Sequence, residues 1–196
     1  MISRLNSAHR KVDSQRGVTL LETAFIIPML LMLAVGLAEV GFLIIDNMAV
    51  ANAAREGARV GAAAGPYEDS TGVINGDTLI LRSVEQALCH IENGKATRVL
   101  IYLADSNGGF ADLGKVNTYD APSSGVLNCS SSGFTLFSCF TCPWDPTTRD
   151  NVPPNLDDLG VLVEFEHNPI LGFFPFNGTL ELSDRAVMRI EPDTRG

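Results

Sequence analysis

The sequence predicts an α+β protein, in which a long N-terminal transmembrane helix continues into a globular domain with a small antiparallel sheet packed against helix. Three observations predict this fold class. Residues 18–45 are almost entirely apolar, residues 46–65 continue in an alanine-rich pattern, and three later segments have the branched, aromatic or alternating residues of strands. The length of 196 residues, with 45% hydrophobic and 19% charged residues, suits one domain with appendages.

The expected organisation has four parts. Residues 1–17 form a cytoplasmic leader, residues 18–45 a transmembrane helix and residues 46–65 a helical extension. Residues 66–196 form a periplasmic or extracellular α+β domain, which carries a disulfide-containing insertion at residues 105–154.

The apolar run is long enough to cross a bilayer. Residues 18–45 would span roughly 42 Å as a helix, whereas the hydrocarbon core measures about 30 Å. Pro28 removes one backbone donor and predicts a local kink or loosening. The polar residues within the run are few: Thr19, Glu22, Thr23 and Glu39.

Charge is distributed unevenly along the chain. The net charge is −9, yet the first 17 residues carry four basic side chains against one acidic one. The positive-inside bias therefore keeps the leader in the cytoplasm and exports the acidic remainder. The acidic balance also argues against nucleic-acid binding.

Residues 46–65 should continue as helix and stop at Gly65-Pro66. Small residues recur there at steps of four, which lets another backbone approach closely. Arg55 and Arg59 form a neighbouring row, with Glu56 beside Arg59. The pattern predicts a packing seam against the globular body or against other subunits, or else an alanine-rich helix with solvated charges. The small residues are Ala49, Ala53, Gly57, Gly61 and Gly65.

The rest of the chain predicts one more helix and a small sheet. Residues 78–92 carry a helical apolar stripe, and residues 97–104 read as a buried strand. Residues 159–166 and 179–190 should pair as an antiparallel hairpin. The insertion at residues 105–154, which precedes this hairpin, looks irregular, with one short strand at residues 134–140.

The four cysteines all follow the apolar run, so they would be exported. An even count in an oxidising compartment predicts two disulfides, and free thiols are the alternative. One bridge is expected within the close trio and another from its third member to Cys89. The predicted disulfide residues are Cys89, Cys129, Cys139 and Cys142.

No catalytic, metal or cofactor site is predicted. His9, His90 and His167 are scattered, and Cys139-Phe140-Thr141-Cys142 lacks the second pair that a zinc site needs. Residues 105–112 resemble a calcium loop only faintly, because position six lacks glycine and position twelve lacks a carboxylate, so a tight polar turn is the preferred interpretation. We therefore expect no enzyme.

The start of the apolar run resembles a class III signal. Arg16-Gly17-Val18-Thr19-Leu20-Leu21-Glu22 combines a basic leader, a glycine, four mostly apolar residues and a glutamate. The resemblance implies that a prepilin peptidase cuts between Gly17 and Val18, leaving Glu22 as the fifth residue of the mature chain. It also implies that Glu22 contacts the new α-amine of a neighbouring subunit during assembly. The alternative is a carboxylate that reaches the lipid headgroups.

A longer segment is similar to the TadE-like family of minor pilins or pseudopilins of the tight-adherence (Tad, or Flp) pilus system. The resemblance rests on Glu22, Pro28, Glu39, Gly41-Phe42 and residues 54–59 (AREGAR). It implies a bacterial inner-membrane protein with its N-terminus in the cytoplasm and its C-terminal domain in the periplasm, or in an extracellular pilus after assembly. The implied partners are a prepilin peptidase, other pilin subunits, the assembly platform and the inner membrane.

Two alternatives stay open. Gly-Val-Thr-Leu-Leu-Glu also fits pseudopilins of type II secretion or type IVa pilus systems. A single-pass, unprocessed periplasmic domain that binds a ligand is the other alternative. Glu39 has a second interpretation as the residue that ends the spanning part of the helix.

Overall fold

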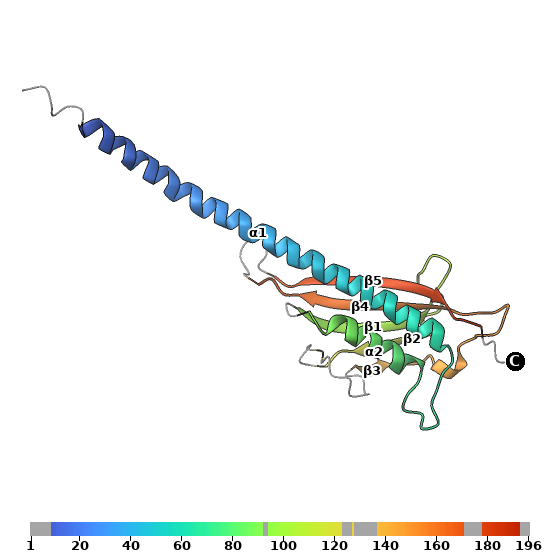
Figure 1. The fold of residues 1–196 in the computed structure, drawn as a ribbon. Helices are drawn as coiled ribbons and strands as arrows, with labels where there is room; N and C mark the ends of the chain where they lie inside the picture. Colours follow the sequence, from blue (N-terminus) through green and yellow to red (C-terminus); the bar gives the residue numbers. More distant parts are fainter. Residues whose placement is uncertain (1–8, 92–93, 123–126, 128–136, 171–177, 193–196) are drawn as a thin grey trace, which may run out of the picture. The chain divides into compact units, whose positions relative to one another are not determined.

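The computed structural model describes residues 9–91, 94–122, 127, 137–170 and 178–192, with side chains described from residue 17 onward. Its elements in order are α1 (His9–Ala64), α2 (Gly76–Leu88), β1 (Gly94–Leu103), β2 (Val116–Asp120), β3 (Ser138–Thr141), the 3₁₀ turn η1 (Pro146–Thr148), β4 (Asp158–His167) and β5 (Leu180–Arg189) (Figure 1). The chain divides into two compact units, Met1–Phe42 and Leu43–Gly196, and α1 runs through both. The fold class is α+β, as predicted.

Helix α1 extends beyond the predicted apolar run at both ends. It begins at His9 and continues through Pro28 to Ala64. Gly65 then adopts a positive φ of 56°, and its backbone N–H donates to the Gly61 carbonyl at 3.0 Å. A glycine in the left-handed conformation followed by Pro66 ends the helix where the sequence predicted.

In the second unit, one face of α1 is buried at helical spacing. Burial recurs at steps of three and four residues, which is the period of one helix face. The buried residues are Asp46, Val50, Ala53, Ala54, Gly57, Ala58, Gly61 and Ala62.

Helix α2 begins two residues before the predicted start, because Asn75 caps it. The Asn75 side-chain oxygen accepts a hydrogen bond from the Thr78 backbone N–H at 3.0 Å. The helix ends at Leu88, and the Ile91 N–H donates to the Leu88 carbonyl at 3.0 Å in a tighter turn. The predicted apolar stripe therefore included the buried Leu81, Val84 and Leu88, but it missed the buried Ile80 and overran the end of the helix.

The sheet has five antiparallel strands in the order β3-β2-β1-β4-β5. The centre is the pairing of β1 with β4, where Val99 lies opposite Val163 and Ile101 opposite Val161. These four side chains are fully buried in the core that the sheet shares with α2 and the second part of α1. The predicted hairpin of the last two strands is confirmed, with Val161 opposite Ala186.

The insertion is more ordered than the sequence predicted. It supplies β2 and β3, and β2 was not expected at all. The short strand predicted at residues 134–140 is found as Ser138–Thr141, while residues 134–136 lie outside the described part of the chain. The sequence of β2, VNTYD, lacks apolar alternation, so its place in the sheet depends on side-chain contacts with other parts of the chain.

Candidate functional site

The predicted processing segment lies on the first part of α1. Gly17, Val18 and Glu22 are all exposed, and a Cβ added to Gly17 would meet nothing within 4 Å. The Thr23 hydroxyl donates to the Thr19 carbonyl at 2.7 Å, a local bond that satisfies this polar group within the helix. The segment therefore presents its side chains outward on a regular helix.

The same helix is long and apolar enough to cross a membrane. Within the part of the chain that the structure describes, Gly17–Ala64 is the one helix with this length and composition. Large apolar side chains such as Leu20, Phe25 and Met29 are more than 70% exposed in the absence of lipid. Exposed apolar side chains on this scale are typical of a membrane-facing helix, and the helix suggests membrane anchoring.

Glu39 differs from Glu22 in its surroundings. Its side chain is only 3% exposed, whereas Glu22 is exposed. A carboxylate is costly to bury, so a buried glutamate usually marks a structural or functional requirement. The two glutamates of the apolar run therefore occupy different environments.

The small-residue seam of α1 packs within the chain. A Cβ on Gly57 would lie 2.9 Å from Val84 Cγ2, and a Cβ on Gly61 would lie 2.7 Å from both Ile80 Cδ1 and Leu159 Cδ2. Contacts this short leave no room for a side chain, so glycine lets α1 approach α2 and β4. Of the two partners that the sequence left open, the structure places this seam against the globular body.

Arg55 and Arg59 lie on the exposed side of α1. Arg59 Nε donates to Glu56 Oε2 at 3.0 Å, and Arg55 Nη1 donates to Asn52 Oδ1 at 3.4 Å. Exposed pairs of this kind contribute little to stability. The row is therefore a locally paired, solvated surface of the helix.

A buried histidine–aspartate contact near the start of the second unit was not predicted. His167 Nδ1 lies 2.6 Å from Asp46 Oδ2, and both side chains are almost fully buried. The contact joins α1 to the last residue of β4 across 121 positions of sequence. Asp46 follows directly after the apolar run, which was the one available signal, but nothing in the sequence pointed to His167 as its partner.

The comparisons with known proteins bear on α1. Residues 17–59 match the family model described as TadE-like protein. The predicted resemblance is confirmed over this segment, and the match begins at Gly17, the glycine of the predicted processing site. Among curated proteins no match was found, and none was found among solved structures. The TadE-like segment, residues 17–59, is associated with proteins of the Tad pilus and suggests a structural, non-enzymatic protein with other pilus components as partners.

Outside the TadE-like segment, the body contains one disulfide between described residues. Cys139 and Cys142 are joined, with their Cα atoms 6.1 Å apart. Cys89 is also disulfide-bonded. The fourth cysteine, Cys129, lies outside the described residues, so its pairing with Cys89 stays a prediction.

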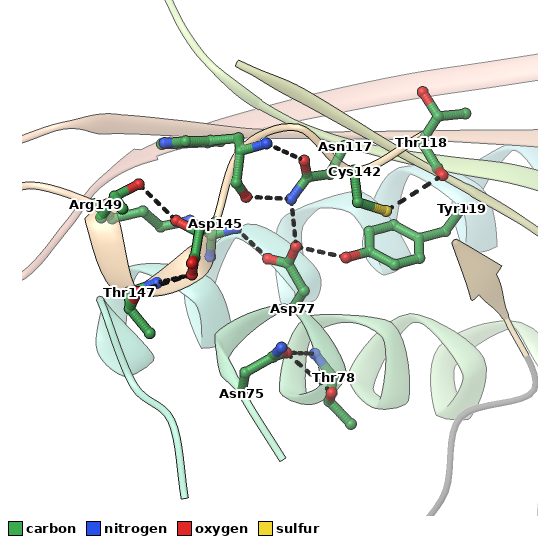
Figure 2. A network of polar contacts seen from close by, with 12 residues as sticks. Asn75, Asp77, Thr78, Asn117, Thr118, Tyr119, Cys142, Asp145, Thr147 and Arg149 are labelled. Carbon is green, nitrogen blue, oxygen red and sulfur yellow. Dashed lines mark hydrogen bonds and ion pairs between the residues drawn. The ribbon is translucent and has the colours of Figure 1, made fainter. Parts of the chain in front are cut away.

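A buried polar network ties the insertion to α2 (Figure 2). The Asp77 carboxylate forms an ion pair with Arg149 and accepts hydrogen bonds from Asn117 Nδ2 and Tyr119 Oη, each at 2.7 Å. Burial first, and the Asp77 carboxylate second, raise the pKa of Tyr119 far above its usual range. Asn117 also exchanges hydrogen bonds with the backbone of Trp144 at 2.6 and 2.8 Å.

This network explains β2. Asn117 and Tyr119 face the core side of the sheet, where apolar residues would be expected, and their polar atoms are satisfied by Asp77 and the Trp144 backbone. The guanidinium of Arg149 lies 4.6 Å from the centroid of the Trp144 ring, which adds a cation–π contact. The partners of Asn117 are 27 and 40 residues away, which is why local patterning did not reveal them.

The calcium-like turn is closed by its own backbone. Asp105 Oδ1 accepts hydrogen bonds from the N–H groups of Asn107 and Gly109, both at 2.8 Å. Gly108 has a φ of 77°, which suits a tight turn. In the described part of the chain, no three His, Cys, Asp or Glu side chains gather as a metal site would require.

A hollow of about 280 Å³ lies on the sheet face at β1, β4 and β5. Three of its charged lining residues, Arg98, Glu164 and Glu166, take part in cross-strand pairs. Lys95 Nζ lies 2.8 Å from Glu166 Oε2, and Arg98 Nη1 lies 3.7 Å from Glu164 Oε2. Paired, half-exposed charges of this kind stabilise the strands they join.

Proposed function

We propose that this chain is a TadE-like minor pilin, or pseudopilin, which a prepilin peptidase processes between Gly17 and Val18 and which takes part in the assembly of tight-adherence pili. The observation that carries the proposal is the position of two features at the start of the apolar helix. The match to the TadE-like model begins at Gly17, and the exposed apolar helix carries its first carboxylate at Glu22, five residues later.

The proposed topology follows from charge and redox chemistry. The basic residues before Gly17 favour a cytoplasmic N-terminus, so the second unit would be exported. The disulfide between Cys139 and Cys142 supports an oxidising compartment such as the periplasm, because cytosolic thiols are kept reduced. The domain boundaries at residues 17, 45 and 65 and the insertion at residues 105–154 belong to this proposal.

Within the proposed function, the side chains of α1 have separate roles. Gly57 and Gly61 hold the body against the helix, so they would support assembly indirectly by shaping the subunit. Glu22 is exposed on the apolar helix and would contact the α-amine of a neighbouring subunit. Arg55 and Arg59 face solvent in one copy and are available to other pilus components.

Processing can be tested at Gly17 with a matched control. We expect the protein extracted from native membranes to begin at Val18 by intact mass and N-terminal sequencing, and Gly17→Leu to leave it uncut. Gly36→Leu should be cut normally, because Gly36 lies away from the proposed cleavage site. The two variants are matched, since an added Cβ would meet no atom within 4 Å at either glycine. A wild-type chain that still begins at Met1 in cells with an active prepilin peptidase would overturn the proposal and favour an unprocessed, membrane-anchored binding domain.

Glu22→Gln separates processing from assembly. The amide keeps the size of the side chain but removes the charge that would attract an α-amine. We expect the variant to begin at Val18 and to reach the membrane in normal amount, while its content in sheared pili falls more than tenfold. Normal incorporation would show that the carboxylate has no assembly role.

A further inference from the structure

Strand β5 lies at the margin of the sheet, with β4 as its neighbour on one side (Figure 1). It is ten residues long, and in the described structure no strand pairs with its other side. A long edge strand presents backbone N–H and C=O groups that another strand can bind. Native proteins usually block such an edge, which makes its details informative.

The register shows which groups face outward. The Ile190 N–H donates to the Asp157 carbonyl at 2.9 Å, so Ile190 points its backbone groups toward β4. In an antiparallel ladder, inward and outward residues alternate. Glu181, Ser183 and Arg185 therefore direct their backbone groups outward, and their side chains are exposed.

One of these outward groups is already occupied. Asp184 Oδ1 accepts the hydrogen bond of the Arg185 backbone N–H at 2.7 Å. Farther along, the Glu191 N–H donates to the Ala62 carbonyl of α1 at 2.9 Å. The edge is thus closed at Asp184 by a side chain and near its end by α1.

The charges of β5 complement a second copy of the same strand. If two β5 strands pair antiparallel with Ser183 opposite Ser183, each Glu181 lies opposite the Arg185 of the other copy. Opposite charges that face each other across two strands are stabilising. In this register the Arg185 N–H would donate to the Glu181 carbonyl of the other copy, and that N–H is the group that Asp184 occupies.

We propose that Asp184 blocks strand pairing at the β5 edge. The partner that it excludes is the β5 strand of a second copy of this chain, paired antiparallel about Ser183. The carboxylate satisfies the edge N–H within one copy and removes two backbone hydrogen bonds from the twofold pairing. The exported domain then stays unpaired at this edge. This blocking by the Asp184 carboxylate does not depend on processing at Gly17.

The test uses a thiol placed on the twofold axis. In the full chain, purified in detergent, Ser183→Cys adds a reactive thiol on β5. The described cysteines Cys89, Cys139 and Cys142 are disulfide-bonded, and Cys129 is common to all the variants compared. A short bismaleimide then reports β5–β5 pairing as a cross-linked dimer. We expect at least a fivefold rise in dimer yield when Asp184→Ala is added to Ser183→Cys. Asp184→Asn should stay at the parent level, because the amide oxygen still accepts the Arg185 N–H.

A second change tests the register. Glu181→Arg in the Ser183→Cys, Asp184→Ala background places like charges opposite each other and should return the dimer yield to the parent level. Equal yields of cross-linked dimer for the Asp184→Ala, Asp184→Asn and parent proteins would show that Asp184 does not block pairing, and would overturn the proposal. A dimer that forms with Asp184→Ala but survives Glu181→Arg comes from unspecific or unfolded association and also overturns the proposal.

Discussion

In the first part of α1, the described side chains of residues 17–34 are all exposed, whereas Ala53, Gly57 and Gly61 in the second part are buried against the sheet and α2. The helix is continuous, yet its two parts meet different requirements. The first part presents large apolar side chains outward, as a lipid-facing helix must. The second part keeps its side chains small so that the body can approach the backbone.

The difference teaches how specificity is distributed along the chain. Substitutions among residues 17–34 leave intramolecular packing unchanged, so under the proposed function their effects should be seen in processing and assembly. Substitutions in the second part and in the body change buried contacts, so their effects should be seen in stability. This contrast can be tested by pairs of changes that are chemically alike but placed in different surroundings.

The largest expected effect is in the body, at Asp77. Asp77→Ala removes the carboxylate that neutralises the buried guanidinium of Arg149. Removing one member of a buried ion pair costs roughly 3–5 kcal/mol, because the other charge is left uncompensated. We expect the thermal unfolding temperature of the detergent-solubilised chain to fall by about 10 °C, while the far-ultraviolet signal of the apolar helix persists above that transition.

Asp145→Ala is the matched control for this change. Asp145 caps η1 by accepting the Thr147 N–H at 2.9 Å, but its carboxylate is exposed. The shift should be much smaller than for Asp77→Ala. Similar shifts for the two variants would mean that the buried pair is not an important contributor to stability.

The next effect compares two glycines on the same helix. In Gly61→Leu the new Cβ alone would lie 2.7 Å from side-chain atoms of Ile80 and Leu159, so the leucine has no room. In Gly36→Leu the new side chain extends into open space. Overpacking of this kind costs about 1–3 kcal/mol. We expect the midpoint of urea unfolding to fall for Gly61→Leu and to stay unchanged for Gly36→Leu. Equal midpoints would contradict the assignment of the seam to the body.

Much of this division could be predicted from sequence, because it depends on local patterns. The apolar run, the stop at Gly65-Pro66 and the β4–β5 hairpin follow from composition and periodicity. The small-residue steps at Gly57 and Gly61 predicted close packing, although they did not identify which surface would fill it.

The missed features depend on contacts between distant residues. The pairing of Asp46 with His167 spans 121 positions, and no local signal specifies it. Strand β2 was missed because Asn117 and Tyr119 are polar residues at core positions, where Asp77 satisfies them. A polar segment of this kind reads as a loop until its partners are placed beside it.

The smallest predicted effect concerns the hydroxyl of Tyr119. Tyr119→Phe removes one hydrogen bond to Asp77 and should cost about 1–2 kcal/mol near neutral pH. Burial raises the pKa of Tyr119 in the folded state, so above the ordinary value of about 10 the unfolded chain ionises while the folded chain does not. Wild-type stability contributed by this group is therefore present below pH 10 and is lost as the pH rises further. Phenylalanine has no such loss, so the gap between the two proteins in urea unfolding should narrow from pH 8 to pH 10.5. Tyr67→Phe, at an exposed position, should neither lower the stability near neutral pH nor change the difference from wild type as the pH rises. If the difference in stability between wild type and Tyr119→Phe stays constant with pH, the phenol of Tyr119 is not held neutral by burial.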